Sequence, residues 1–166
     1  MSVEREIELT EQVGSIVKWQ AYGLKEISLD IPRTVYPPRE DTRLLDRTLA
    51  ELTGVKPGSL LEIGCGSGAV CIAAALRGWE VSACDVNPLA IAATIGNAAK
   101  LGIEWGATIR EGGPGDIGKW EPHNGVDVIA WNLPYIESNS GPSLGPMEDS
   151  ALIGHGESEK LLEAIT

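Results

Sequence analysis

The chain has 166 residues, of which 43% are hydrophobic and 22% are charged, a composition typical of a globular domain and not of a disordered segment. Its 13 Lys and Arg against 24 Asp and Glu side chains give a formal net charge of -11 without any basic run, which argues against direct binding to nucleic acid. No stretch approaches the roughly 20 apolar residues that span a bilayer, and the N-terminus lacks the apolar core of a signal peptide.

Residues 1–40 are predicted to form an N-terminal extension ahead of a core that occupies residues 41–166. Within the extension, residues 1–17 are expected to open with a short helix. The alternating pattern of residues 24–31 predicts a short strand or half of a hairpin. Two adjacent prolines near the end of the extension exclude regular structure just before the core begins.

The core is predicted to begin with a helix that runs from Asp41 to about Leu52. Asp41 and Thr42 are residue types that cap helix N-termini well, and Gly54 is expected to stop the helix. Leucines recur at helical spacing and predict one buried face, made of Leu44, Leu45, Leu49 and Leu52.

From Ser59 onward the pattern changes to alternating strands and helices. Strands are predicted at residues 59–64, 80–85, 107–111 and 126–132. Helices are predicted at residues 67–77, at residues 88–102 with Asn87 as N-cap and Pro88 at the first helical position, and from near Gly156. This alternation predicts an α/β, Rossmann-like fold with a mostly parallel sheet and helices on both faces.

Unusual residues gather at the carboxyl ends of the predicted strands, where parallel sheets bind ligands. The first strand runs into LLEIGCGSG, whose Gly64, Gly66 and Gly68 allow a ligand to approach the backbone closely. Asp85 ends the second strand, where a carboxylate can accept both hydroxyls of a ribose. A glycine-rich loop after one strand and an acid at the end of the next are together the general signature of a site for a nucleoside-containing cofactor.

Two details select the cofactor. The loop is spaced GxGxG, not GxGxxG as in dinucleotide folds, and Glu62 just before it suits an ammonium group better than a pyrophosphate. The loop and Asp85 resemble motif I and the acidic motif II of class I S-adenosylmethionine-dependent methyltransferases. The resemblance implies S-adenosyl-L-methionine as cofactor and S-adenosyl-L-homocysteine as product, bound by Glu62, Gly64, Cys65, Gly66, Gly68, Asp85, Val86, Asp116, Ile117 and Asn132.

The fourth strand ends in Asn132, Leu133, Pro134 and Tyr135, which resembles the [N/D/S]-P-P-[Y/F/W] box of methyltransferases that act on a planar nitrogen. In those enzymes the Asn oxygen and the next backbone carbonyl accept hydrogen bonds from an NH₂ group, and the aromatic ring stacks on it. The resemblance implies that these four residues are catalytic. Leu133 replaces the usual first proline, so the backbone carbonyl is kept while φ is no longer fixed.

The flanking segments narrow the resemblance to the protein N5-glutamine methyltransferases of the HemK/PrmC-like type, which modify release factors. TVYPPREDTRLL is similar to the stretch that precedes their core. MEDSALIGHGESEKLLEAI is similar to a helix start that follows their Asn box, with His155 replacing a glycine. Asp116 and Ile117 fall where that family has an Asp and an apolar residue beside the adenine, although Glu111 is a competing acid. The implied acceptor is the glutamine side chain of a release factor.

Two alternatives remain open. The same box serves exocyclic amino groups of adenine or cytosine in DNA or RNA, an acceptor that the negative charge opposes unless a basic partner supplies the binding face. The family's sheet has seven strands and only four core strands are found here, so the last strands are expected to be missing. The second alternative is therefore a truncated or non-catalytic cofactor-binding subunit, and the open sheet edge predicts an activating partner subunit or a dimer that covers it.

The remaining cysteine, histidine and tryptophan residues suggest structural roles. Three cysteines lie in apolar runs, which indicates reduced core residues of a cytoplasmic protein: Cys65, Cys71 and Cys84. His123 and His155 lie in polar loops and are expected to face solvent, so no metal site is predicted. Trp131, just before Asn132, is expected to help wall the pocket.

Overall fold

The structure of the protein is a computed structural model. It describes residues 14–52, 56–105, 108–114, 120 and 125–133, with the backbone of residues 136–137 and 153–154. The sequence predictions that lie outside this set include the short helix at the start of residues 1–17, the stop at Gly54, the helix from near Gly156 and the exposure of the two histidines.

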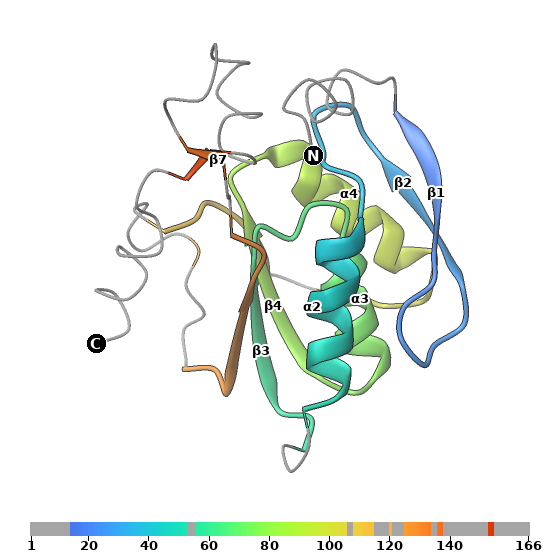
Figure 1. The fold of residues 1–166 in the computed structure, drawn as a ribbon, viewed down its shortest axis with the longest axis vertical. Coiled ribbons are helices and arrows are strands. Elements are labelled where there is room, and N and C mark those ends of the chain that lie inside the picture. The colour runs from blue at the N-terminus through green and yellow to red at the C-terminus, as the bar shows by residue number, and fades with distance from the viewer. Residues whose placement is uncertain are drawn as a thin grey trace.

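A four-stranded parallel sheet forms the centre of the molecule (Figure 1). The strands lie in the order β5-β4-β3-β6, and all four carboxyl ends meet at one edge. Each strand falls inside a segment predicted from the sequence, so the α/β prediction is confirmed. The bounds are Ser59–Ile63 for β3, Glu80–Asp85 for β4, Ile109–Glu111 for β5 and Val128–Trp131 for β6.

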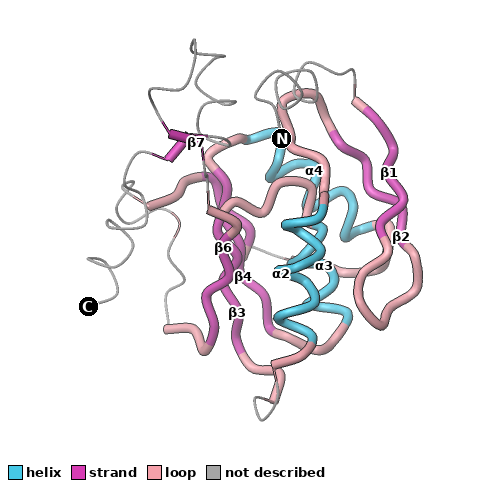
Figure 2. The backbone as a smooth tube through the Cα atoms, in the orientation of Figure 1, coloured by secondary structure: helices cyan, strands magenta, loops and turns pink. Residues whose placement is uncertain are grey.

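Three described helices cover one face of this sheet: α2 (Glu40–Ala50), α3 (Ala69–Leu76) and α4 (Pro88–Ala99) (Figures 1 and 2). Helix α3 connects β3 to β4 and is rich in alanine, and Ala73 and Ala74 are fully buried. Their small side chains let the helix pack closely between the sheet and α2. Helix α4 begins as predicted, because the Asn87 side chain accepts a hydrogen bond from the Leu89 N–H at 3.0 Å and Pro88 occupies the first turn.

The two faces of the sheet carry separate apolar clusters, because successive side chains of a strand point to opposite faces. Leu60 packs in the large cluster on the helix side, whereas Leu61 and Ile63 lie in a smaller cluster on the other face with Cys84 and Trp120. All three cysteines are buried and free, as expected. Helices on the second face remain a prediction from the sequence.

Helix α2 differs from its prediction in its start, its buried face and its end. It begins at Glu40, with Arg39 as N-cap, and the Thr42 hydroxyl accepts a hydrogen bond from the Arg39 N–H at 3.2 Å. Its buried face also differs, because Leu44 is 67% exposed while Asp46 is buried. Asp46 is turned inward because it pairs with Arg77 at 2.7 Å and accepts the Tyr22 N–H. The helix ends at Ala50, two residues earlier than predicted.

An antiparallel hairpin, β1 (Ser15–Trp19) and β2 (Ile27–Ile31), lies beyond the helices (Figure 1). It confirms the strand predicted at residues 24–31. Strand β1 occupies the end of the segment 1–17, whose opening residues, where the short helix is expected, lie outside the described set. A strand is stabilised by its cross-strand partner, and this pairing decides the conformation here. Trp19 and Leu29 are fully buried in the large cluster, so the hairpin and the sheet share one core. A further parallel pair joins β7 (Ile136–Glu137) to β8 (Ile153–Gly154).

Candidate active site at the carboxyl edge of the sheet

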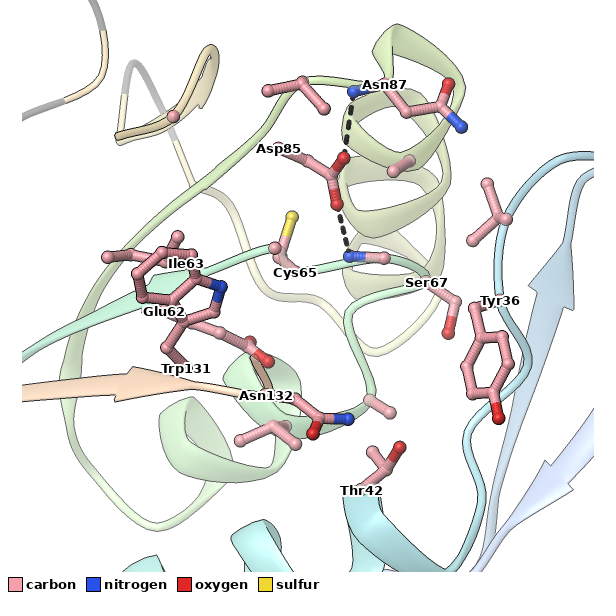
Figure 3. A pocket seen from close by; sticks show the side chains of 18 of the residues that line it. Tyr36, Thr42, Glu62, Ile63, Cys65, Ser67, Asp85, Asn87, Trp131 and Asn132 are labelled. Atoms are coloured by element: carbon pink, nitrogen blue, oxygen red, sulfur yellow. Dashed lines mark hydrogen bonds between the residues drawn. The ribbon is translucent and has the colours of Figure 1, made fainter. Parts of the chain in front are cut away.

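A pocket of about 240 Å³ opens at the carboxyl ends of the strands (Figure 3). Its walls come from five segments: the stretch before and into α2, the loop after β3, the end of β4, the loop after β5 and the end of β6. Asp85 and Asn132 both line this pocket, although β3 lies between their strands. The parallel topology thus brings both residues to one pocket.

The loop after β3 forms the floor of the pocket. Gly64 and Gly66 have φ of +71° and +56°, in the left-handed region that favours glycine. A Cβ on Gly66 would meet nothing nearer than 3.9 Å, so its backbone conformation, more than crowding, requires glycine here. The loop is held against β4, because the N–H groups of Gly64 and Cys65 both donate to the Cys84 carbonyl. The backbone of this loop is therefore rigid and open to a ligand.

Gly68 has a different role from the other two glycines. It lies outside the pocket wall and forms the N-cap of α3 with φ of +86°. A Cβ there would stand 3.1 Å from the Thr94 hydroxyl and 3.2 Å from the Thr94 Cα. Gly68 is thus needed for the close packing of α3 on α4, where the sequence had suggested a contact with the cofactor.

Asp85 projects into the pocket from the end of β4. Its two carboxylate oxygens accept the N–H groups of Gly66 and Asn87, each at 2.9 Å (Figure 3). Burial raises the pKa of Asp85, and these two hydrogen bonds oppose the rise. A carboxylate offers about four acceptor sites, so two remain for a ligand. This capacity fits the pair of hydroxyls on a ribose.

Glu62 is buried at the back of the pocket, next to the first turn of α3. One carboxylate oxygen accepts the Cys71 N–H at 2.8 Å, which satisfies a backbone donor that the helix itself leaves open. Burial, the largest cause, raises the pKa of Glu62 from 4.5 to about 8. Glu62 therefore anchors the helix as well as facing the pocket, a structural role that its sequence position did not reveal.

The segment before α2 closes one side of the pocket, and it is held by contacts that no local sequence pattern indicates. Thr34 has φ of 70°, a strained conformation for a β-branched residue. The Asn87 side chain donates to both the carbonyl and the hydroxyl of Thr34, at 3.2 and 3.1 Å. Asn87 thus connects this segment to Asp85, whose carboxylate accepts its backbone N–H.

Asn132 lies exposed at the end of β6, at the pocket rim (Figure 3). Its side-chain Nδ2 donates a hydrogen bond to Asp41 Oδ2, in the first turn of α2, at 3.0 Å. Leu133 also lines the pocket and is 45% exposed. Trp131 walls the pocket as expected, with its indole Nε1 at 3.9 Å from the position of a Cβ on Gly64.

The other predicted site residues are divided between the pocket and the undescribed part of the chain. Val86 lines the pocket and is exposed, whereas the Cys65 thiol is buried beside the Thr94 hydroxyl and burial raises its pKa. Four predicted residues lie outside the described set: Asp116, Ile117, Pro134 and Tyr135. No cluster of His, Cys, Asp and Glu able to hold a metal ion occurs among the residues that the structure describes.

The described lining of the pocket is acidic. Asp41, Glu62 and Asp85 all contribute to it, and no Lys, Arg or His is among the described lining residues. Such a wall favours a cationic ligand and opposes the phosphates of a dinucleotide. The open glycine loop, the ribose-type acceptor and the acidic wall together fit S-adenosylmethionine, which carries a sulfonium and an ammonium group.

In the described part of the chain, no helix has the length and apolarity to cross a bilayer.

Comparison with known proteins gives the family. The family model of ribosomal protein L11 methyltransferase (PrmA) matches residues 42–133, which is more than half of the chain. A release factor glutamine methyltransferase from Fusobacterium nucleatum is 32% identical over 132 residues, which are 78% of this chain and 36% of that protein. A putative protein N5-glutamine methyltransferase from Methanocaldococcus jannaschii is 28% identical over 141 residues, which are 84% of this chain and 67% of that protein.

A solved structure supports the fold. The ribosomal protein L11 methylase from Lactobacillus delbrueckii subsp. bulgaricus superposes with a TM-score of 0.51 at 23% identity, covering 79% of this chain and 69% of the other. The chain spans about a third of the length of the Fusobacterium relative, 36%. Family, fold and pocket agree: the chain belongs to the class I S-adenosylmethionine-dependent methyltransferases, in the family of the ribosomal protein L11 methyltransferase model, and the cofactor of this family is S-adenosylmethionine.

Proposed function

We propose that this chain transfers a methyl group from S-adenosylmethionine to the nitrogen of a planar amide, and that the favoured acceptor is the glutamine side chain of a release factor. The observation that carries the proposal is the position of Asn132. It stands at the rim of the pocket that Asp85 also lines, and its side-chain NH₂ donates a hydrogen bond to Asp41. An Asn at this place can hold an NH₂ group in front of a bound cofactor.

Each lining residue has a defined part in this proposal. Asp85 accepts the ribose hydroxyls, the glycine loop lies along the cofactor, and Glu62 faces its positive charge. When bound, S-adenosylmethionine supplies an electrophilic methyl group. Asn132 Oδ1 and the Leu133 carbonyl accept the two hydrogens of the acceptor nitrogen. The family resemblance assigns the aromatic ring of Tyr135 to stacking on the planar acceptor, and assigns Val86, Asp116 and Ile117 to the adenine; of these four residues only Val86 belongs to the described pocket lining.

The chemistry requires positioning more than a strong base. The lone pair of an amide nitrogen is delocalised into its carbonyl, so the nitrogen is a weak nucleophile. Two acceptors that grip its hydrogens favour the geometry in which the lone pair points out of the amide system. Alignment of this kind, in a site that excludes water, supplies much of the rate in reactions between two bound groups.

Glutamine is favoured among acceptors because the two glutamine methyltransferase relatives match 78% and 84% of this chain, a range that extends beyond the nucleotide-binding half. A ribosomal protein is the second candidate, since the L11 methyltransferase model matches residues 42–133. A nucleic acid acceptor is opposed by the net charge of -11 and the acidic pocket. A subunit that binds the cofactor without catalysis is the remaining alternative.

Transfer of labelled methyl groups tests the proposal. The acceptors are a release-factor domain, the same domain with its glutamine changed to Ala, ribosomal protein L11, and RNA and DNA. Label in the release factor that disappears with the Gln→Ala change supports the proposal. Label in L11 or nucleic acid alone refutes the glutamine assignment, and tight binding of S-adenosylhomocysteine without any transfer favours the non-catalytic alternative.

Asn132→Ala is the matched test of mechanism. It should abolish transfer, because the acceptor nitrogen loses its side-chain anchor, while the affinity for S-adenosylhomocysteine changes by a small factor only. Asp85→Ala should do the opposite and weaken cofactor binding first. Full activity in Asn132→Ala would refute the role of Asn132.

The proposal includes a partner that pairs with the outer side of strand β6. Among the described strands of the central sheet, β6 is hydrogen-bonded to β3 alone. An unpaired strand edge invites association, so a second copy of the chain or an activating subunit is expected to cover it. Sedimentation velocity of the chain alone and with its candidate partner would detect this; a monomer at all concentrations would exclude the dimer.

A further inference from the structure

The geometry points to Asp41 as a positioning residue that sets the orientation of the Asn132 amide, and thereby selects acceptors that donate hydrogen bonds. This inference rests on the proposed function of Asn132. Asp41 lies 91 positions before Asn132 in the chain, and the two side chains meet at 3.0 Å across the mouth of the pocket. Both residues line the pocket.

A carboxylate decides which end of an amide faces it. An ionised carboxylate can only accept hydrogen bonds, whereas an amide offers an NH₂ group at one end and a carbonyl oxygen at the other. The Asn132 NH₂ must therefore face Asp41, as observed. Turning the amide over would bring two acceptors together and lose the bond. The carbonyl oxygen is thus directed away from Asp41.

The oxygen that is directed away is available for a substrate. Among the described residues, Asn132 Oδ1 accepts no hydrogen bond, and Asn132 is exposed at the pocket rim (Figure 3). Its preferred partner is a donor such as the NH₂ of an amide or amine. A group that presents only acceptors, such as a carbonyl or a carboxylate, would meet Oδ1 unfavourably. Asp41 therefore acts on acceptor choice without contacting the acceptor.

Asp41 is itself held in place. Its other oxygen, Oδ1, accepts the Thr42 N–H at 2.7 Å in the first turn of α2, so the two carboxylate oxygens serve different partners. Asp41 is half-buried, while its neighbour Glu40 has a side chain that is 83% exposed. A hydrogen bond to a charged acceptor is also stronger than one between neutral groups, and it polarises the amide so that Oδ1 becomes a better acceptor.

A simpler interpretation is that Asp41 only stabilises the start of α2, because acidic side chains are favourable in the first turn of a helix. A comparison with Glu40 distinguishes the two interpretations. Glu40 is also acidic and in the first turn of α2, but it is turned toward solvent and lies outside the pocket wall. Glu40→Ala is therefore the matched control for the loss of one negative charge at the same helix terminus.

The experiment compares Asp41→Ala, Asp41→Asn and Glu40→Ala in two independent ways. The first is the side-chain NH₂ signal of Asn132 in ¹H–¹⁵N spectra, assigned with Asn132→Ala. The inference predicts that Asp41→Ala shifts this signal and speeds the rotation of the amide, while Glu40→Ala leaves it in place. An unchanged signal in Asp41→Ala would overturn the inference whether or not the protein is active.

The second readout is kinetic. Asp41→Ala should lower kcat by about 10- to 100-fold, the usual cost of losing a group that orients a catalytic side chain, with the dissociation constant of S-adenosylhomocysteine changed less than about threefold. Asp41→Asn should recover part of kcat, because its carbonyl oxygen can accept the same bond without the charge. A normal kcat in Asp41→Ala, or a loss shared equally by Glu40→Ala, would overturn the inference. Absence of transfer by the unmodified chain would instead count against the proposed function.

Discussion

Glu62 makes the stability of this protein depend on pH, and the dependence can be worked out from its environment. The Glu62 residue is 4% exposed, and the pKa of its carboxyl group is raised from 4.5 to about 8. An acid whose pKa is higher in the folded than in the unfolded state does not lower the free energy of unfolding at low pH, where it is protonated in both states. The free energy of unfolding then falls as pH rises through this window, because the unfolded chain releases its proton first. The full shift corresponds to about 5 kcal/mol.

The perturbation is Glu62→Gln, which keeps an oxygen that can accept the Cys71 N–H but cannot ionise. Between pH 5 and pH 8 the unmodified protein should lose about 3 to 4 kcal/mol of unfolding free energy through this group, whereas the variant should not. Urea denaturation at several pH values, without ligand, measures the free energy of unfolding of the unmodified protein and of the variant. Asp85 also has a raised pKa, but it is present in both proteins, so the difference between their slopes isolates Glu62.

Any constant cost of burying the amide in Glu62→Gln shifts the unfolding free energy of the variant equally at every pH, so it does not change the slope of that free energy with pH. Parallel pH profiles for the two proteins would refute the reasoning. A second consequence concerns binding. A cationic ligand should lower the pKa of Glu62 and release its proton near pH 7, so the calorimetric heat of binding should depend on the ionisation heat of the buffer. This dependence should shrink in Glu62→Gln.

Two further predictions concern stability. Asp46→Ala should cost about 3 to 5 kcal/mol, because Asp46 is buried and its removal leaves the Tyr22 N–H without its acceptor and Arg77 without its carboxylate partner, although Arg77 still donates to the Tyr22 carbonyl. Glu51→Ala, which removes the exposed pair with Arg47, should cost less than about 1 kcal/mol. Gly68→Ala should cost about 1 to 3 kcal/mol more than Gly23→Ala, because both glycines have positive φ but only Gly68 would place its Cβ against Thr94. Denaturant titration checks both, and equal losses within either pair of variants would contradict the explanation.

Local signals in the sequence were sufficient for most of the central fold. Strands β3 and β6 are mostly apolar runs bounded by glycine or by polar residues, and Asn87–Pro88 is a helix start that needs no distant partner. Parallel topology then placed Asp85 and Asn132 at one edge of the sheet, because all carboxyl ends of parallel strands meet there. Fold, family and cofactor therefore followed from short motifs and their order.

Contacts between distant segments decided the rest. Strand β1 depends on its pairing with β2. In α2, Asp46 is buried and Leu44 is exposed, because Asp46 has partners on the hairpin and at the end of α3. The raised pKa of Glu62 depends on its burial under α3, and no spacing in the sequence reports burial.

The same distinction applies to the reactive end of the pocket. The sequence alone determined that an asparagine ends β6, since that residue is part of a short motif. Only the tertiary structure decided how its amide is turned, because the orientation depends on Asp41, 91 positions away. Hydrogen bonds act over about 3 Å, and only the folded chain brings those two side chains within that distance.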